Sequence, residues 1–112
     1  FKPLVYICSP YAGDVERNIE KAKIYSRFAV IERNAIAFAP HLLFPMYLSD
    51  DNPAERELAL FMDIVFLGKC NELWVFGENI TKGMQMEIDK AKKRRMTIRH
   101  FTEGMEEVET CK

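Results

Sequence analysis

Residues 4–14, LVYICSPYAGD, contain the pattern that decides the fold. The run Leu4–Cys8 is continuously apolar, which is typical of a strand buried on both of its faces. The segment SPYAGD then breaks the strand, and Asp14 can cap a helix that runs to about residue 34. The stretch therefore predicts a strand, a tight loop and a helix, which together form the first part of a parallel α/β unit.

The same alternation continues along the chain. Further strands are predicted at AIAFA, ELWVFG and MTIRHF, which cover residues 35–39, 72–77 and 96–101. Pro53 suits the first turn of a second helix, and a third helix lies within residues 79–95. The order βαβαβαβ predicts an α/β fold. We expect a single Rossmann-like (flavodoxin-like) doubly wound parallel sheet of four to five strands, with helices on both faces.

The composition limits the class of protein. The chain has 112 residues, of which 48% are apolar and 29% charged, as in a soluble globular domain. This domain is predicted over residues 1–102, followed by a polar C-terminal tail over residues 103–112. The net charge of −1 argues against nucleic acid as a partner. No apolar run reaches the roughly 18 residues that span a membrane.

The cysteines indicate a reducing compartment. Their number, three, is odd, and no CxxC pair occurs, so we expect neither a disulfide framework nor a zinc site. The N-terminal stretch FKPLVYICSP lacks the layout of a signal peptide. We therefore expect a cytoplasmic protein that uses no metal and no other cofactor.

In a doubly wound sheet, ligands bind beyond the carboxyl ends of the strands. The loops at that edge are SPYAGD, PHLLFP and GENITKG. The longer segment HLLFPMYLSDDN has no regular pattern, and a loop of this length is often functional. We therefore expect the ligand-binding residues in these loops and in the helix that follows the third strand.

Glu87 lies one turn into that helix, behind Thr81 and Gly83. The free backbone N–H groups and the dipole of a helix start favour an anion at this position. The alternative is that Thr81 is an ordinary cap and Glu87 a solvated surface acid. No Walker motif and no GxGxxG motif accompanies the pattern.

Asp63 interrupts LALFMDIVFL, a helical stretch that is otherwise apolar on every side. Such a helix is usually covered on both sides, so we expect the sheet on one side and a second copy of the chain on the other, in a homodimer. A carboxylate in this stretch needs a hydrogen-bond partner or a cleft. Alternatively, Asp63 reaches water or pairs with an arginine.

Other candidate residues have ordinary structural alternatives. A buried Tyr6 hydroxyl needs a partner, although Tyr6 can also be a plain core residue. His41 either lies in a ligand pocket or is a satisfied loop histidine. Met84 and Met86 either form the wall of an apolar base pocket or fill gaps in the core. Cys8 has no evident base beside it, so we do not expect a nucleophilic cysteine.

Four segments give the chain a resemblance to a known family: VYICSPYAG, FAPHLL, ELWVFG preceded by Asp63, and KGMQMEIDKA. They resemble the nucleoside 2-deoxyribosyltransferase superfamily, including its nucleoside monophosphate N-glycosidase branch. The separation of Asp63 from Glu87 also fits that family. Short uncharacterised bacterial and phage proteins with the same segments look closer still to this chain.

The resemblance implies a substrate and a mechanism. It implies a nucleoside or a nucleoside 5'-monophosphate as the ligand, with Glu87 as the nucleophile that forms a glycosyl ester. Asp63 would protonate or hold the departing base, and Tyr6 would orient Glu87. The implied substrate-binding residues lie in the three loops and the helix start: Ser9, Pro10, Tyr11, His41, Gly77, Thr81, Gly83, Met84 and Met86.

The chain departs from that family in its first loop. Members that bind phosphate tend to have an arginine there, and Ala12 stands near the matching place, with Arg17 the nearest substitute. Thr81 matches the hydroxyl residue that contacts phosphate in the monophosphate branch. Three functions stay open at this point: an N-glycosidase or deoxyribosyltransferase, a nucleotide-binding or sensing protein without turnover, and a structural or interaction domain.

Overall fold

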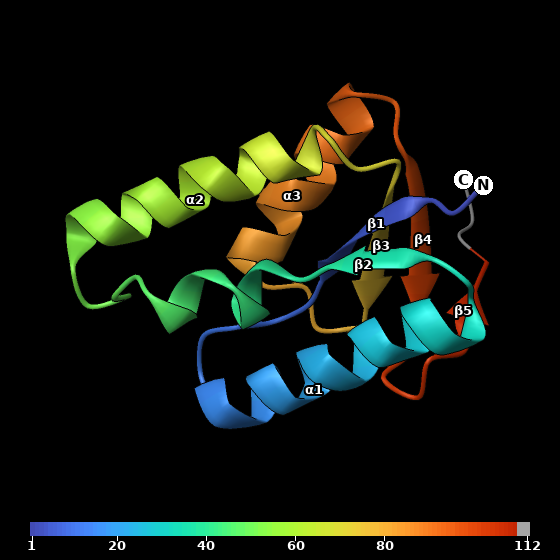
Figure 1. The fold of residues 1–112 in the computed structure, drawn as a ribbon, viewed down its shortest axis with the longest axis horizontal. Helices are drawn as coiled ribbons and strands as arrows, with labels where there is room; N and C mark the ends of the chain where they lie inside the picture. Colours follow the sequence, from blue (N-terminus) through green and yellow to red (C-terminus); the bar gives the residue numbers. More distant parts are fainter. Residues whose placement is uncertain (110–112) are drawn as a thin grey trace.

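The computed structural model describes residues 1–109, which form one layer of sheet between two layers of helices (Figure 1). The elements follow in the order β1 (Leu4–Cys8), α1 (Val15–Arg27), η1 (Phe28–Glu32), β2 (Ile36–Phe38), η2 (Pro40–Leu42), η3 (Phe44–Met46), α2 (Pro53–Leu67), β3 (Glu72–Phe76), α3 (Lys82–Lys93), β4 (Thr97–Phe101) and β5 (Glu107–Val108).

The sheet has the strand order β2-β1-β3-β4-β5, in which the first four strands are parallel. This confirms the predicted doubly wound α/β fold, and the order is the flavodoxin-like one. The fifth strand comes from the predicted tail and pairs antiparallel with β4. The end of that tail, residues 110–112, lies outside the described residues. Because the strand order reverses between β1 and β3, a crevice is expected at their carboxyl ends.

The predicted elements differ from the observed ones mainly at their ends. The first helix is regular only to Arg27 and then continues as a π-helical turn over Phe28–Glu32. The segment expected to be irregular contains two short 3₁₀ turns, each with a proline, Pro40 or Pro45, in its first turn. A proline fits that place because it needs no hydrogen-bond donor there and its φ angle is already set.

Side-chain alternation along β1 divides the core in two. Val5 and Ile7 pack on the side of α1, with the aromatic residues of β3 and β4. Tyr6 and Cys8 point to the opposite side, toward α2 and α3. Figure 1 shows α1 below the sheet and the other two long helices above it. The side chain of Tyr6 on β1 thus points toward the first turns of α3.

None of the helices in residues 1–109 has both the length and the apolar character that a membrane crossing requires. Cys8 and Cys70 are free thiols, and both are buried.

Candidate active site

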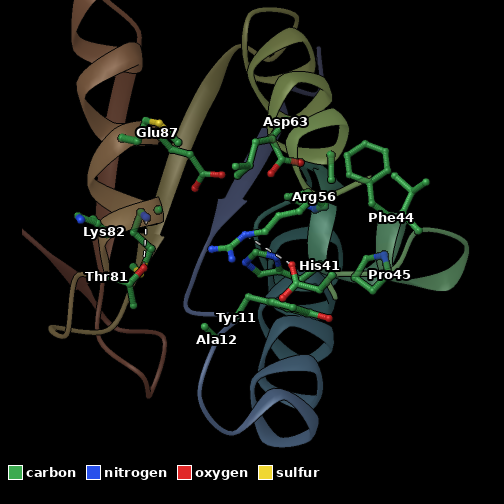
Figure 2. A pocket seen from close by; sticks show the side chains of 18 of the residues that line it. Tyr11, Ala12, His41, Phe44, Pro45, Arg56, Asp63, Thr81, Lys82 and Glu87 are labelled. Atoms are coloured by element: carbon green, nitrogen blue, oxygen red, sulfur yellow. Dashed lines mark hydrogen bonds and ion pairs between the residues drawn. The ribbon is translucent and has the colours of Figure 1, made fainter. Parts of the chain in front are cut away.

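A cavity of about 370 Å³ lies at the carboxyl ends of β1 and β3, at the expected crevice (Figure 2). Its walls come from the loop after β1, the segment of the two 3₁₀ turns, α2 and the first turns of α3. A volume of this size is in the usual range of small-molecule sites. The predicted site residues that line the cavity are Ser9, Tyr11, His41, Asp63, Thr81, Gly83, Met84, Met86 and Glu87.

Two predicted binding residues, Pro10 and Gly77, are not among the lining residues in the described part of the chain. Gly77 has a φ angle of +89°, and an added Cβ would lie 3.5 Å from Cγ of Glu103. Gly77 therefore allows the backbone conformation of the turn after β3. Arg17, the proposed substitute for a phosphate-binding arginine, also lies outside the lining, whereas Ala12 is part of it.

Glu87, which lines the cavity, forms a buried pair with Tyr6, which is not among the lining residues in the described part of the chain. The Tyr6 hydroxyl, which is fully buried, donates a 2.6 Å hydrogen bond to Oε2 of Glu87. Burial raises the pKa of Glu87 to about 7, although hydrogen bonds from Tyr6 and Cys8 lower it. The sequence alternative in which Glu87 is a solvated acid is wrong, because only 7% of its surface is exposed.

Asp63 faces the same cavity from α2, opposite Glu87 (Figure 2). Its Oδ1 atom is buried and has no hydrogen-bond partner among the described residues. Burial and then the negative charge of Glu87 raise the pKa of Asp63 to about 7. A buried oxygen without a partner is costly, and Oδ1 is therefore available to a hydrogen-bond partner that enters the cavity.

The first turn of α3 has the features of an anion-binding helix start. The Thr81 side chain caps it and accepts a 3.2 Å hydrogen bond from the backbone N–H of Met84. Gly83 has open space where a side chain would be, since no atom lies within 4 Å of an added Cβ. Ser9 lies at the end of β1, and its Oγ is buried without a partner in the described part of the chain.

Two positively charged residues in the cavity wall, Arg56 and Lys82, were missed by the sequence analysis. Arg56 lies about two turns before Asp63 on α2, so helical periodicity places both on one face and was the signal available. The Arg56 side chain is 64% exposed and pairs with Asp50 at 3.9 Å. Lys82 is the first residue of α3.

In residues 1–109, no group of three or more His, Cys, Asp or Glu side chains is arranged to hold a metal ion. The fold and the cavity together define an α/β protein with two facing carboxyl groups at the switch point of its sheet. By sequence, the chain belongs to the family described as Domain of unknown function (DUF7768), which residues 3–101 match. A search of curated proteins found no matching sequence.

Solved structures resemble the fold. One is a 2-deoxyribosyltransferase from the psychrotolerant bacterium Bacillus psychrosaccharolyticus, with a TM-score of 0.72 and 12% sequence identity. The match covers 96% of this chain and 77% of that enzyme. At this identity the comparison establishes the shared α/β fold alone.

Proposed function

We propose that this protein is an enzyme that breaks the N-glycosidic bond of a nucleoside or nucleoside 5'-monophosphate, or transfers its deoxyribosyl group to another base. Glu87 is the nucleophile, Asp63 is the acid, and Tyr6 orients Glu87. The observation that carries the proposal is the buried Tyr6–Glu87 hydrogen bond facing an unpartnered Asp63 across one cavity. The proposed catalytic domain is residues 1–102, which contain all three side chains.

The ionisation of the two acids supports these roles. Tyr6 donates to Glu87 and so favours the charged form that a nucleophile needs. Burial, and then the negative charge of Glu87, raises the pKa of Asp63 to about 7, which favours the protonated form that an acid needs. Both acids have a pKa of about 7, so their pKa values alone do not assign the two roles. The assignment rests on the hydrogen bond from Tyr6, which Glu87 receives, and a pair of carboxyl groups is the expected equipment for glycosidic bond cleavage.

The chemistry balances with these groups alone. A carboxylate oxygen of Glu87 attacks the anomeric carbon, the bond to the base breaks, and its electron pair goes to the base nitrogen. The carboxyl group of Asp63 supplies the proton that neutralises the base. Water then attacks the anomeric carbon, the ester bond to Glu87 breaks, and the water proton goes to Asp63. When a second base attacks in place of water, the outcome is transfer.

The ligand is proposed to lie with its sugar beside Gly83 and Glu87. Open space at Gly83 lets the sugar approach the carboxylate. A 5'-phosphate would lie against the start of α3, near Thr81 and Lys82. The base would lie among the remaining walls, where the apolar side chains of Phe44 and Met86 line the cavity.

We also propose a homodimer in the cytoplasm. Apolar side chains on α2 are exposed in a single chain, including Leu58 at 49%, Phe61 at 66% and Val65 at 40%. A second copy that covers this face would remove them from water. Reduced cysteines in the cytoplasm agree with the buried free thiols of Cys8 and Cys70.

The deciding experiment incubates the protein with a panel of nucleosides and nucleoside 5'-monophosphates. Released base is measured by chromatography, and mass spectrometry gives the mass of the intact protein and of its proteolytic peptides. We expect base release, together with a fraction of protein whose mass has increased by one glycosyl group on the peptide that contains Glu87. Binding of a nucleotide without release of any base would instead make this a nucleotide-binding protein and would refute the enzymatic proposal.

A further inference from the structure

The orientation of His41 indicates which bases the cavity prefers. This inference rests on the proposed function. His41 lines the cavity, and its Nε2 lies 2.8 Å from the backbone carbonyl oxygen of Ser9. Its ring also packs on the ring of Tyr11, with 4.9 Å between centroids and 35° between planes. The imidazole is thus held from two directions, so its remaining nitrogen has a fixed place.

The contact with Ser9 decides the tautomer. A carbonyl oxygen only accepts hydrogen bonds, so Nε2 must carry the proton and donate it. Burial lowers the pKa of His41, although the hydrogen bond to Ser9 opposes this, and the neutral ring prevails at neutral pH. In a neutral ring with the proton on Nε2, Nδ1 has a free lone pair and can only accept.

Within residues 1–109, the hydrogen bond to Ser9 is the only one that the His41 ring makes. Its Nδ1 is also not one of the buried atoms without a partner, which are Ser9 Oγ and Asp63 Oδ1, so solvent can reach it. Figure 2 shows His41 on the side of the cavity away from α3, together with Asp63 and Phe44. That side is the one proposed to hold the base, because the sugar has to reach Glu87 on α3.

We propose that His41 is a specificity-determining residue whose Nδ1 accepts a hydrogen bond from an exocyclic amino group, so that the cavity prefers amino-bearing bases to their keto counterparts. Adenine and cytosine present an amino group where hypoxanthine and uracil present an oxygen. An oxygen placed against Nδ1 would set two acceptors together and leave both without a hydrogen bond in a partly buried site.

Two other side chains in the cavity wall have only donors, and of these Lys82 lies at the start of α3, where the phosphate is proposed to lie. Arg56 has only donors and would favour a keto oxygen. Its side chain is 64% exposed and turned to Asp50, whereas His41 is partly buried and held by two contacts. The structure therefore favours His41 as the group that meets the base edge.

The test compares bases that differ only in this group. Release of adenine is measured against release of hypoxanthine from otherwise identical 2'-deoxynucleosides and their 5'-monophosphates, and cytosine against uracil in the same way. We expect kcat/KM to favour the amino-bearing member by about tenfold in each pair that is turned over. Equal rates, or a preference for the keto member, would overturn the role of His41.

His41→Phe tests the assignment, because it retains an aromatic ring against Tyr11 but removes the acceptor. The measured quantity is the amino-to-keto ratio, which a general loss of activity or folding does not change. We expect the ratio to fall to about one. The matched control is Phe44→Leu, which reshapes the cavity without altering a polar atom and should keep the preference. A ratio that survives in His41→Phe would refute the inference.

Titration calorimetry with the free bases separates this inference from the proposed function. Tighter binding of adenine than hypoxanthine, or of cytosine than uracil, without any turnover, would support the role of His41 while refuting the enzymatic proposal. Turnover without a preference between the bases would support the enzymatic proposal and refute the role of His41. Absence of both binding and turnover would refute both.

Discussion

The hydroxyl of Tyr6 donates a 2.6 Å hydrogen bond to Oε2 of Glu87, although the two residues lie 81 positions apart. The sheet explains the contact, because β1 pairs directly with β3 and α3 follows β3. The side chain of Tyr6 points to the α3 side of the sheet, where Glu87 is buried.

Loss of the Tyr6 hydroxyl should move the pH profile. The proposed mechanism requires an ionised Glu87, so activity is expected to fall as pH drops through its pKa of about 7. The hydrogen bond from Tyr6 lowers that pKa, so Tyr6→Phe should raise it and shift the acid limb of kcat/KM to higher pH. Tyr11→Phe, which also loses a hydroxyl in the cavity region, serves as the control. An acid limb that stays in place in Tyr6→Phe would argue against this coupling.

The two acids should respond differently to neutralisation. Glu87→Gln keeps the shape but lacks the carboxylate, so the glycosyl ester should not form while ligand binding persists. Asp63→Asn should slow base release by about 10²–10⁴-fold, the range of a lost general acid. It should still form the ester with a substrate whose base leaves readily. Mass spectrometry of the two variants makes the comparison, and base release by Glu87→Gln at the parent rate would disprove the mechanism.

Gly83→Ala should separate stability from activity. Gly83 is helical and has open space at the Cβ position, so alanine is expected to stabilise the protein by about 0.5–1 kcal/mol. The added methyl group would occupy the proposed path of the sugar, and kcat/KM should drop by about tenfold. Thermal denaturation and base release are measured together, with Gln85→Ala, an exposed change on α3, as control. Full activity in Gly83→Ala would place the sugar elsewhere.

Thr81 should matter for phosphate and not for the sugar. Thr81→Val removes the hydroxyl at the start of α3 and should weaken binding of a monophosphate by about 1–2 kcal/mol, with little change for the nucleoside. Loss of the helix cap should also cost about 1 kcal/mol of stability. Titration calorimetry of Thr81→Val and Thr81→Ser makes the comparison, since serine keeps the hydroxyl. An equal loss for both ligands would locate the phosphate away from α3, and Arg56 or Arg17 would then be tested.

The apolar face of α2 predicts self-association. Sedimentation at micromolar concentration should give twice the mass of one chain, because Leu58, Phe61 and Val65 are too exposed for a lone domain. Phe61→Ser should shift the equilibrium toward the monomer, whereas Ile24→Ser, which changes an exposed apolar residue on α1, should not. A monomeric parent protein would contradict the proposed dimer.

The sequence by itself was enough to predict the type and order of the three long helices and the four parallel strands. The apolar run Leu4–Cys8 and the pattern behind Asp14 are local signals, because strand and helix periodicity act over a few neighbouring residues. Glu87 and Asp63 could be singled out in the same way, each from its place on one helix. The short strand β5 (Glu107–Val108) could not, since two residues are too few to carry a strand pattern and their pairing depends on β4.

Only the tertiary structure decided which side chains share the cavity. Strand order determines which loops become neighbours, and no local pattern encodes that order. The strand order places Asp63, Glu87 and Arg56 in the wall of one cavity. Gly77 lies in the turn after β3 and is not among the lining residues that the structure describes. Burial depends on the same packing, and burial is what raises the pKa of each acid to about 7. The sequence thus determined the candidate groups, and packing decided their distances and protonation.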